Sequence, residues 1–384
     1  MERLRRWRAP ASIGLLVAVP TILIVAHVGR WIVADDSGGD LRIAYLGGAH
    51  AILDGRSLFP GLQDPAVAAG TAYVYPPLLA FLTVPLTVVS GSVAVALGMV
   101  VAAILVPVIL LIAGVRDYRC IGAAMLWAPV SNEVQTVNVS ILVALLLAIA
   151  WRTRDRHLPS GLAIGGALAL KLFGWPLLVW PFAMRRVRAS LIGTAFAAAL
   201  ILGSWAAIGF AGFTGYPALL DRLAHVEASH SYSLVGAAAA LGLGDAVGKA
   251  LALLLMAGLV AWCLITGRQG DDRRSFAAAA LAAIAFAPIV WLHYFLLLLV
   301  ALAVTRPRFS AVWLLPLLMW LSPQAGNGTW YQTIIVVGAA TGVAVACLRQ
   351  PHGSQLPSDT SGVRPGVGRP GAGGIRKSST SRRP

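Results

Sequence analysis

The sequence predicts an all-α polytopic membrane protein, whose chain crosses the bilayer many times. Hydrophobic residues make up 58% of its 384 residues and charged residues only 12%, whereas soluble domains average about 45–50% and about 25%. Apolar stretches recur along the chain and lack the period-two alternation of a membrane β-barrel. These observations exclude a water-soluble globule. The net charge is +15, but the basic residues lie in short clusters between apolar stretches, which favours a role in membrane topology over nucleic-acid binding.

The basic clusters orient the chain in the membrane. All but six of the 30 Lys and Arg residues lie in these clusters, which we place on the cytoplasmic side because positively charged loops are retained there. Successive clusters must then enclose an even number of spans. We therefore expect about twelve transmembrane helices in the plasma membrane, with both termini cytoplasmic. The predicted spans are 12–33, 93–115, 119–131, 138–151, 160–170, 174–184, 189–211, 246–266, 275–290, 294–305, 309–322 and 330–348.

The regions outside these spans differ in character. The segment 34–92 is a long first extracytoplasmic loop that carries short surface helices. Within it, 76–89 begins with two prolines and is either a re-entrant or a surface helix. Residues 1–348 form the transmembrane domain, whereas 349–384 are rich in Gly, Pro, Ser and Arg and are expected to be a disordered basic cytoplasmic tail. Several spans are shorter than the ~20 residues that cross a bilayer, which predicts a cavity opening to the outer side.

Ionisable residues near the membrane are candidates for function. Asp40 precedes a stretch, 41–52, whose apolar residues share one helical face. It therefore either caps this helix or acts as a catalytic carboxylate. Lys171 lies between two apolar segments and either snorkels to the interface or meets a phosphate. His293 is either a hydrogen-bonded interface residue or part of the same site.

No metal or cofactor site is identifiable in the sequence. Asp35 and Asp36 are adjacent and are better explained as a solvated acidic turn than as a metal site, because no third metal ligand is identifiable. Binding of a divalent metal ion is an alternative that the sequence leaves open. The chain has no Walker loop, Rossmann fingerprint or HExxH motif, so no cofactor is expected. Further outer polar residues are candidates to line a substrate cavity: Tyr75, Asn132, Glu133, Gln135, Asn138, Glu227, His230 and Tyr294.

Five segments, in order along the chain, resemble one known family and together cover residues about 12–348. GGDLRIAYLGGAHAILDGRSLF resembles the first-loop motif of glycosyltransferase family 87, and YVYPPLLAFLTVPL resembles its Tyr–Pro–Pro–Leu element. VQTVNVSILVALLLAIAWR, GLAIGGALALKLFGWPLLVWPF and APIVWLHYFLLLL are similar to its Gly–Gln–x–Asn, Lys-containing and Ser–Trp–x–His elements. The sequence departs from the family at Val134, Val290 and Tyr294, where Gly, Ser and His are usual.

The resemblance implies the C-type glycosyltransferase fold and an activity. Family members transfer mannose from polyprenyl-phosphate-mannose, with inversion, to lipid-anchored acceptors on the outer face of the plasma membrane. These acceptors are phosphatidylinositol mannosides, lipomannan or lipoarabinomannan. By this resemblance Asp40 matches the catalytic carboxylate and is expected to act as the general base, and Lys171 and His293 match the lysine and histidine of the family motifs. Departure of the donor phosphate needs cationic or hydrogen-bond donor groups, for which Lys171, His293 and Arg222 are candidates. The resemblance does not fix which acceptor is used.

Two other classes of function stay open at this point. A polytopic transporter or lipid flippase of the cell envelope would show an inverted internal repeat and polar residues at mid-membrane. A structural scaffold for envelope assembly would need none of the polar residues. No repeat is visible in the sequence, and the polar residues are predicted to lie on one side of the membrane, which favours the enzyme.

Overall fold

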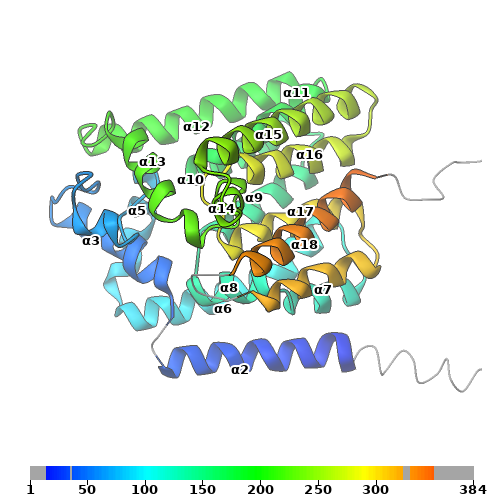
Figure 1. Cartoon of the computed structure of the whole chain (residues 1–384), viewed down its shortest axis with the longest axis horizontal. Helices are drawn as coiled ribbons and strands as arrows, with labels where there is room; N and C mark the ends of the chain where they lie inside the picture. The colour runs from blue at the N-terminus through cyan, green and yellow to red at the C-terminus, as the bar shows by residue number, and fades with distance from the viewer. Residues whose placement is uncertain (1–13, 35–36, 323–328, 350–384) are drawn as a thin grey trace, which may run out of the picture. The chain divides into compact units, whose positions relative to one another are not determined.

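The computed structural model describes residues 14–34, 37–322 and 329–349. Within these ranges the chain consists of helices and connecting loops, without a β-strand. Figure 1 shows these helices packed against one another, with α2 alongside α6 and α8. The sequence prediction of an all-helical protein is therefore confirmed. Asp35, Asp36 and the predicted tail beyond Arg349 lie outside the described residues.

The helices alternate between long apolar rods and short segments. The first half contains η1 (Gly14–Ala18) and α2 (Val19–Ala34), η2 (Asp40–Tyr45), α3 (Leu46–Leu53), α4 (Pro65–Ala68), α5 (Pro77–Thr83), η3 (Val84–Val88), α6 (Gly91–Ala113), α7 (Tyr118–Met125), α8 (Ala128–Thr136), α9 (Ser140–Arg152) and α10 (His157–Leu170). The second half contains η4 (Leu172–Leu178), α11 (Val179–Ala183), α12 (Val187–Ala207), α13 (Tyr216–Val226), η5 (Ala228–His230), α14 (Leu234–Ala240), α15 (Asp245–Arg268), α16 (Asp272–Phe286), η6 (Leu292–Phe295), α17 (Leu296–Thr305), η7 (Ala311–Leu321) and α18 (Trp330–Leu348).

Several of these helices are long and apolar enough to cross a membrane. In the described part of the chain five continuous helices qualify, and six spans result if the bent pair α8 and α9 counts as one. Further apolar helices have only 10–17 residues, as expected for half-spans that meet inside a protein. These findings support a polytopic membrane protein, whereas the count of twelve spans stays a prediction.

Small residues bring α10 and α12 into close contact. A Cβ atom at Gly165 would lie 2.5 Å from the carbonyl oxygen of Gly193, and one at Gly161 would lie 2.7 Å from that of Ala189. Real side chains do not fit at such distances, so these backbones approach as closely as they do only because the positions are glycines. Helices in lipid gain their association energy largely from this kind of packing, since lipid tails are as apolar as leucine.

The segment 131–138 lies where two predicted spans, 119–131 and 138–151, meet and is therefore expected to be an outer turn, but most of it is helical and the turn is confined to the few residues between α8 and α9. α8 continues through Thr136, and Val137 then takes the left-handed conformation with φ 53°. The Asn138 side-chain oxygen accepts the N–H of Ser140 at 2.9 Å, a local bond that competes with helix continuation. As a result α9 starts in a new direction, bent by 119° from α8.

Other predicted spans are also interrupted. The predicted helix 119–131 is split into α7 and α8, because a new helix starts with Pro129 in its first turn. The predicted helix 174–184 starts as the 3₁₀ helix η4. The predicted helix 309–322 is instead the 3₁₀ helix η7, which contains Pro316; a proline inside an α-helix removes a hydrogen bond.

A cluster of ion pairs joins the ends of several helices. The carboxylate of Asp272, at the start of α16, accepts from Arg186 at 2.8 and 3.0 Å and from the indole Nε1 of Trp180 at 2.7 Å. Arg154 lies 3.2 Å from the same carboxylate. Side chains of Asp272 and Arg186 are each 18% exposed, so this network is partly desolvated. Asp155 also contacts Arg186 but is 74% exposed.

Replacing Asp272 should destabilise the protein more than replacing Asp155. Asp272→Ala removes the partly buried carboxylate that Arg154, Arg186 and Trp180 share, so we expect the free energy of unfolding to fall by about 2–3 kcal/mol. Asp155→Ala, the matched control, should lower it by less than about 1 kcal/mol, because exposed ion pairs contribute little. Thermal unfolding of the purified full-length variants in detergent measures both. Equal unfolding temperatures would contradict the assigned role of Asp272.

Candidate active site

Asp40 stands at the beginning of the first short helix after α2. It is the first residue of η2, a π-helical turn that continues into α3, and the N-cap is Gly39. The interpretation of Asp40 as the helix cap is therefore wrong. Gly38 donates its N–H to the carbonyl oxygen of Gln135 at 2.7 Å, which ties the turn to the end of α8. Gly38 has φ +74°, and a Cβ atom there would clash with Val95, so this turn requires glycine.

Asn138 is the centre of the hydrogen-bond network at this site. Its amide nitrogen donates to Asp40 Oδ2 at 3.0 Å and to the Tyr75 hydroxyl at 3.1 Å. Its amide oxygen accepts from Lys171 Nζ at 3.0 Å and from the Ser140 hydroxyl at 2.8 Å. The carboxylate and the ammonium fix this orientation of the amide, because a flipped amide would face each with the wrong partner. Asn138 thus links a carboxylate to a buried cation.

Lys171 is buried, with only 4% of its surface exposed. Its ammonium donates to the Ser140 hydroxyl at 2.8 Å as well as to Asn138. It also lies 3.5 Å from the centroid of the Tyr294 ring, in a favourable cation–π position. No carboxylate of the described chain lies within ion-pair distance of it. Lys171 therefore does not snorkel to the interface, and neutral groups solvate its charge.

Two more buried polar side chains interact electrostatically with Lys171. His293 is 3% exposed, and its Nδ1 lies 3.1 Å from the Asn132 side-chain oxygen. Glu133 is fully buried, and its Oε1 accepts the N–H of Ile141 at 3.1 Å. Within the described residues, His293 Nε2 and Glu133 Oε2 have no hydrogen-bond partner. Such unpaired buried atoms are costly, and they are expected where a ligand supplies the missing partner.

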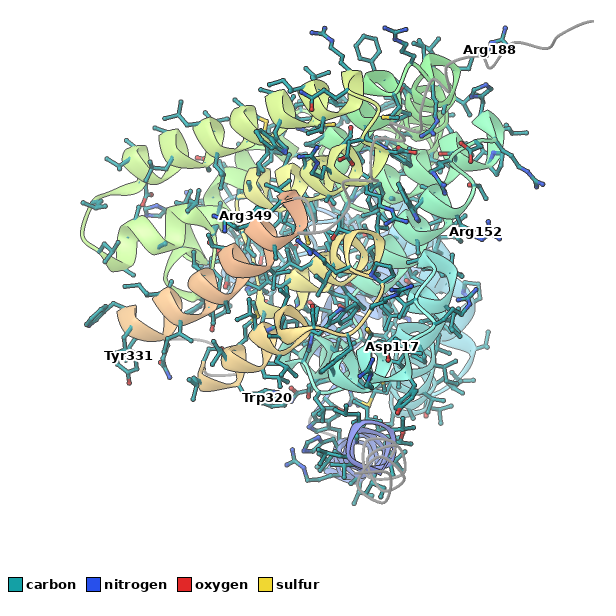
Figure 2. The ribbon with its side chains drawn as sticks, turned by 90° about the vertical axis from the view of Figure 1, so that its right-hand side faces the viewer. Asp117, Arg152, Arg188, Trp320, Tyr331 and Arg349 are labelled. Atoms are coloured by element: carbon teal, nitrogen blue, oxygen red, sulfur yellow. The ribbon has the colours of Figure 1, made fainter. Side chains whose placement is uncertain are left out.

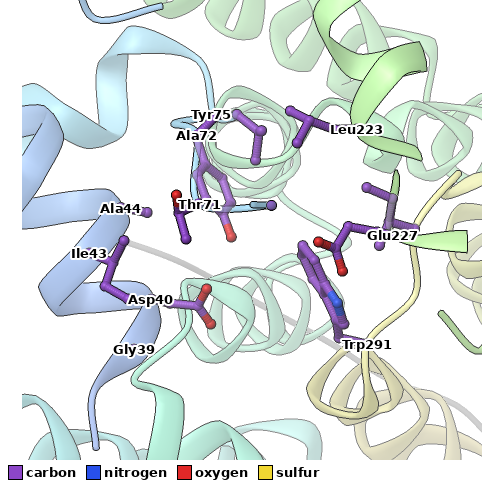
Figure 3. Close-up of a pocket in the computed structure, with 13 residues that line it drawn as sticks. Gly39, Asp40, Ile43, Ala44, Thr71, Ala72, Tyr75, Leu223, Glu227 and Trp291 are labelled. Carbon is purple, nitrogen blue, oxygen red and sulfur yellow. The ribbon is translucent and has the colours of Figure 1, made fainter. Parts of the chain in front are cut away.

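A cavity of about 140 Å³ lies in front of Asp40. Its wall includes Tyr75, Glu227 and Trp291, and Figure 3 shows Asp40 and Glu227 pointing toward one another across it. Gly70 borders the cavity with φ +68°, where any Cβ would collide with the Glu227 carboxylate. We call this cavity the Asp40 cavity. The carboxylates of Asp40 and Glu227 lie on its two opposite walls.

The wall that carries Glu227 and Trp291 is held together by backbone contacts. The Ser231 hydroxyl accepts the N–H of Val290 at 2.9 Å, and the N–H of Tyr232 donates to the carbonyl oxygen of Val290 at 2.7 Å. These bonds join the segment after η5 to the segment before η6. Two regions some sixty residues apart in the sequence are thereby fixed on one side of the cavity.

The electrostatic surroundings favour Asp40 as a proton acceptor. Burial raises the pKa of Asp40 above its ordinary value, and the hydrogen bond from Asn138 and the positive charge of Lys171 offset this only in part. A carboxylate with a raised pKa holds an abstracted proton better than an ordinary aspartate does. Within the described ranges, no group of three or more His, Cys, Asp or Glu side chains is arranged to hold a metal ion.

Most of the predicted site residues gather here. Asp40, Tyr75, Asn132, Glu133, Asn138, Lys171, His293 and Tyr294 form the connected cluster, and Glu227 faces it across the cavity. Gln135 contributes its backbone carbonyl to Gly38. His230 Nδ1 lies 3.4 Å from Glu227. Arg222 is exposed on α13 and is not among the described residues that line the cavity.

Three residues of the site are absent from the sequence prediction. The Tyr45 hydroxyl lies 3.3 Å from that of Tyr75 and accepts the N–H of Val139 at 3.0 Å; its place in the first-loop motif was the available signal. Ser140 contacts Lys171 directly, but a serine at a helix start has no distinctive pattern. Trp291 lines the cavity, although it is equally explained in the sequence as an interfacial aromatic.

The comparisons with known proteins identify the family. A model of glycosyltransferase family 87 matches residues 73–291, more than half of the chain. The chain belongs to glycosyltransferase family 87. It is 27% identical over 339 residues to a protein of Mycobacterium tuberculosis (strain ATCC 25618 / H37Rv) named polyprenol-phosphate-mannose-dependent alpha-(1-2)-phosphatidylinositol mannoside mannosyltransferase, covering 78% of this chain and 79% of that protein. No solved structure matches.

Membership in family 87 confirms the prediction of a glycosyltransferase. The match includes the segments that carry Asn138 and Lys171 and ends at Trp291, and it begins after Asp40. The assignment of Asp40 therefore depends on its position in this structure and on the first-loop motif. The chain of hydrogen bonds from Asp40 through Asn138 to Lys171 connects it to the matched region.

Removing the amide of Asn138 should change the pH dependence of glycosyl transfer. The hydrogen bond from Asn138 stabilises the Asp40 carboxylate and lowers its pKa, so Asn138→Ala should raise that pKa further. A general base must be ionised, and the acidic limb of the pH profile of kcat/KM should therefore move to higher pH. Thermal unfolding controls for folding. An acidic limb that stays in place, or that moves to lower pH, would contradict the link between the two residues.

Proposed function

We propose that this protein is an inverting mannosyltransferase that uses polyprenyl-phosphate-mannose. It transfers mannose to a lipid-anchored mannoside or mannan, of the phosphatidylinositol mannoside, lipomannan or lipoarabinomannan type, on the outer face of the plasma membrane. The observation that carries the proposal is the connection of a cavity-facing carboxylate, Asp40, to a buried cation, Lys171, through Asn138. The mannosyltransferase named above supports the choice of sugar and donor.

Inversion requires one direct displacement at the sugar carbon. Asp40 takes the proton of the acceptor hydroxyl as its oxygen attacks the anomeric carbon, and the bond from that carbon to the phosphate oxygen breaks with its electron pair going to the phosphate. Only one base is needed. Glu133 is unsuited to this role because it is fully buried and accepts a backbone N–H. Glu227 faces the cavity and is the alternative base.

The departing phosphate gains negative charge that a cation can stabilise. Lys171 and His293 do not appear among the described residues that line the Asp40 cavity. Lys171 Nζ lies 5.9 Å from the centroid of the Tyr75 ring, and the His293 ring lies 5.9 Å from that of Trp291, two side chains of the cavity wall. In a buried setting a charge acts over a longer range than in water, because the surroundings screen it less. We assign Lys171 and His293 to the donor phosphate, and we no longer assign Arg222 to it.

An apolar groove suits the lipid tail of the donor. It has a volume of about 440 Å³ and lies along α13, α15 and η4. Phe173 lines this groove and stacks on Tyr294 with 5.3 Å between the ring centroids. Since Lys171 Nζ lies 5.6 Å from the centroid of the Phe173 ring, a prenyl chain in the groove would bring its phosphate toward this cation. The donor would then enter from the lipid side while its sugar reaches the Asp40 cavity.

The distribution of basic residues supports an outer-face site. Figure 2 looks onto the side of the molecule where Arg152, Arg188 and Arg349 are labelled, at the ends or starts of three helices. These residues belong to clusters predicted to be cytoplasmic. Asp40 belongs instead to the first loop, which we assign to the outside together with the site.

Labelling of introduced cysteines tests this topology. Asp64→Cys should react with a membrane-impermeant maleimide added to intact cells, whereas Asp155→Cys should react only after the membrane is opened. Both side chains are exposed, and the native residues Cys120, Cys263 and Cys347 are buried, which limits background. Labelling at position 155 but not at 64 in intact cells would place the site on the cytoplasmic face.

Asp40→Asn should abolish mannose transfer without unfolding the protein. The amide keeps the size of the carboxylate but cannot accept the hydroxyl proton, and loss of a general base costs about 10²–10⁴-fold in rate. Asp155→Asn is the control, and its activity should stay close to that of the original protein. Transfer from polyprenyl-phosphate-mannose to a phosphatidylinositol mannoside measures both. If Asp40→Asn unfolds normally and its activity stays within a few-fold of that of the original protein, Asp40 is not the general base, and that role is reassigned to Glu227.

A further inference from the structure

A second cavity adjoins the Asp40 cavity. It has a volume of about 460 Å³ and lies between α3 and the segment that leads from Arg56 through α4 to Tyr73. The two cavities share wall residues, including Ala44, Thr71 and Ala72. The second cavity therefore meets the Asp40 cavity along these residues. The second cavity is also the larger of the two, at about 460 against about 140 Å³.

The wall of the second cavity is chemically unlike the apolar groove along α15. It presents both hydrogen-bond donors and hydrogen-bond acceptors, from Arg56, Ser57 and Asp64. It also includes the aromatic side chain of Phe59. Carbohydrates have many hydroxyl groups, which need donors and acceptors, and apolar ring faces, which pack on aromatic rings. A lipid chain would find few apolar partners here.

The aromatic part of this wall is rigid. Phe59 stacks on Trp205 with 4.6 Å between the centroids, and its ring also contacts those of Tyr73 and Tyr216 edge to face. The Tyr73 hydroxyl donates to the carbonyl oxygen of Pro76 at 2.9 Å and accepts the N–H of Ala80 at 3.0 Å. A wall fixed in this way is preorganised, so that little ordering energy is needed when a ligand binds.

We propose that this second cavity binds the acceptor glycan, holding the sugar residues next to the one that receives the new mannose. The acceptor hydroxyl then reaches Asp40 past Thr71 and Ala72, while the donor occupies the opposite side near Trp291. The ligand class is a polyhydroxylated glycan headgroup. This inference rests on the proposed transferase function, and it assigns donor and acceptor to different cavities.

A cavity-filling substitution tests the inference. Gly47 lines the second cavity on α3, and a Cβ atom there would meet no other atom within 4 Å, so the side chain introduced by Gly47→Leu starts in open space at the cavity wall. Gly258→Leu is the matched control, since Gly258 is an equally unobstructed, exposed helical glycine on α15 that is absent from the described walls of this cavity. Both changes favour helix formation.

The assay uses the purified full-length protein with octyl α-mannoside as acceptor and radiolabelled polyprenyl-phosphate-mannose as donor. Gly47→Leu should raise the acceptor KM by about tenfold or more, and the donor KM should stay within about twofold. Arg56→Ala, a change at an exposed side chain, should also raise the acceptor KM. Gly258→Leu should alter neither. Unchanged acceptor KM values for both Gly47→Leu and Arg56→Ala would overturn the inference.

A binding measurement separates this inference from the proposed function. Calorimetric titration with octyl α-mannoside should show weaker binding by Gly47→Leu, whereas Asp40→Asn should retain binding because its amide can still hydrogen-bond to the acceptor hydroxyl. If Asp40→Asn retains transfer activity, the assignment of the base fails while the acceptor cavity can stand. If Asp40→Asn is inactive and Gly47→Leu binds the mannoside normally, only the acceptor cavity fails.

Discussion

The site depends on the side chain of Asn138, which holds a carboxylate and a cation at opposite ends of one amide. This arrangement requires the chain to break between α8 and α9, because a continuous helix would carry Asn138 past both partners. Val137 makes the break in a backbone conformation that is strained for a β-branched residue. Helix α6 makes room for the Val137 side chain at Gly98, where a Cβ atom would lie 2.5 Å from that side chain. The packing of an apolar helix thus fixes the geometry of the polar centre.

The sequence alone predicted the class of fold and many of the site residues for one physical reason. Placing a charged or amide side chain in an apolar segment costs free energy, so a residue of this kind is a candidate for a functional role. Lys171, His293 and Asn138 stood out in this way, and all three are buried in one cluster. Arg222 was a candidate only because the implied mechanism needs cations near the donor phosphate, and it is exposed on α13.

Local geometry was much less accessible from the sequence. The polar segment 131–138 looked like a loop because its residues are hydrophilic, but these residues face a protein interior rather than solvent, and most of them are helical. Asp40 looked like a helix cap because capping needs only neighbouring residues, whereas its true partner, Asn138, lies 98 residues away. The contribution of Ser140 likewise depends on contacts across the fold. Such long-range contacts leave no periodic pattern.

The order of the site residues along the chain has a consequence for biosynthesis. Glu133 and Lys171 leave the ribosome long before Trp291 and His293, which complete the surroundings of Lys171 together with Tyr294. Because synthesis is slow compared with helix formation, the nascent chain must hold an incompletely solvated ammonium and a carboxyl group during insertion. Any early pairing between these two groups has to be given up once the last third of the chain arrives. The surroundings of Lys171 are therefore complete only after the last third of the chain, which supplies Tyr294, has been synthesised and inserted.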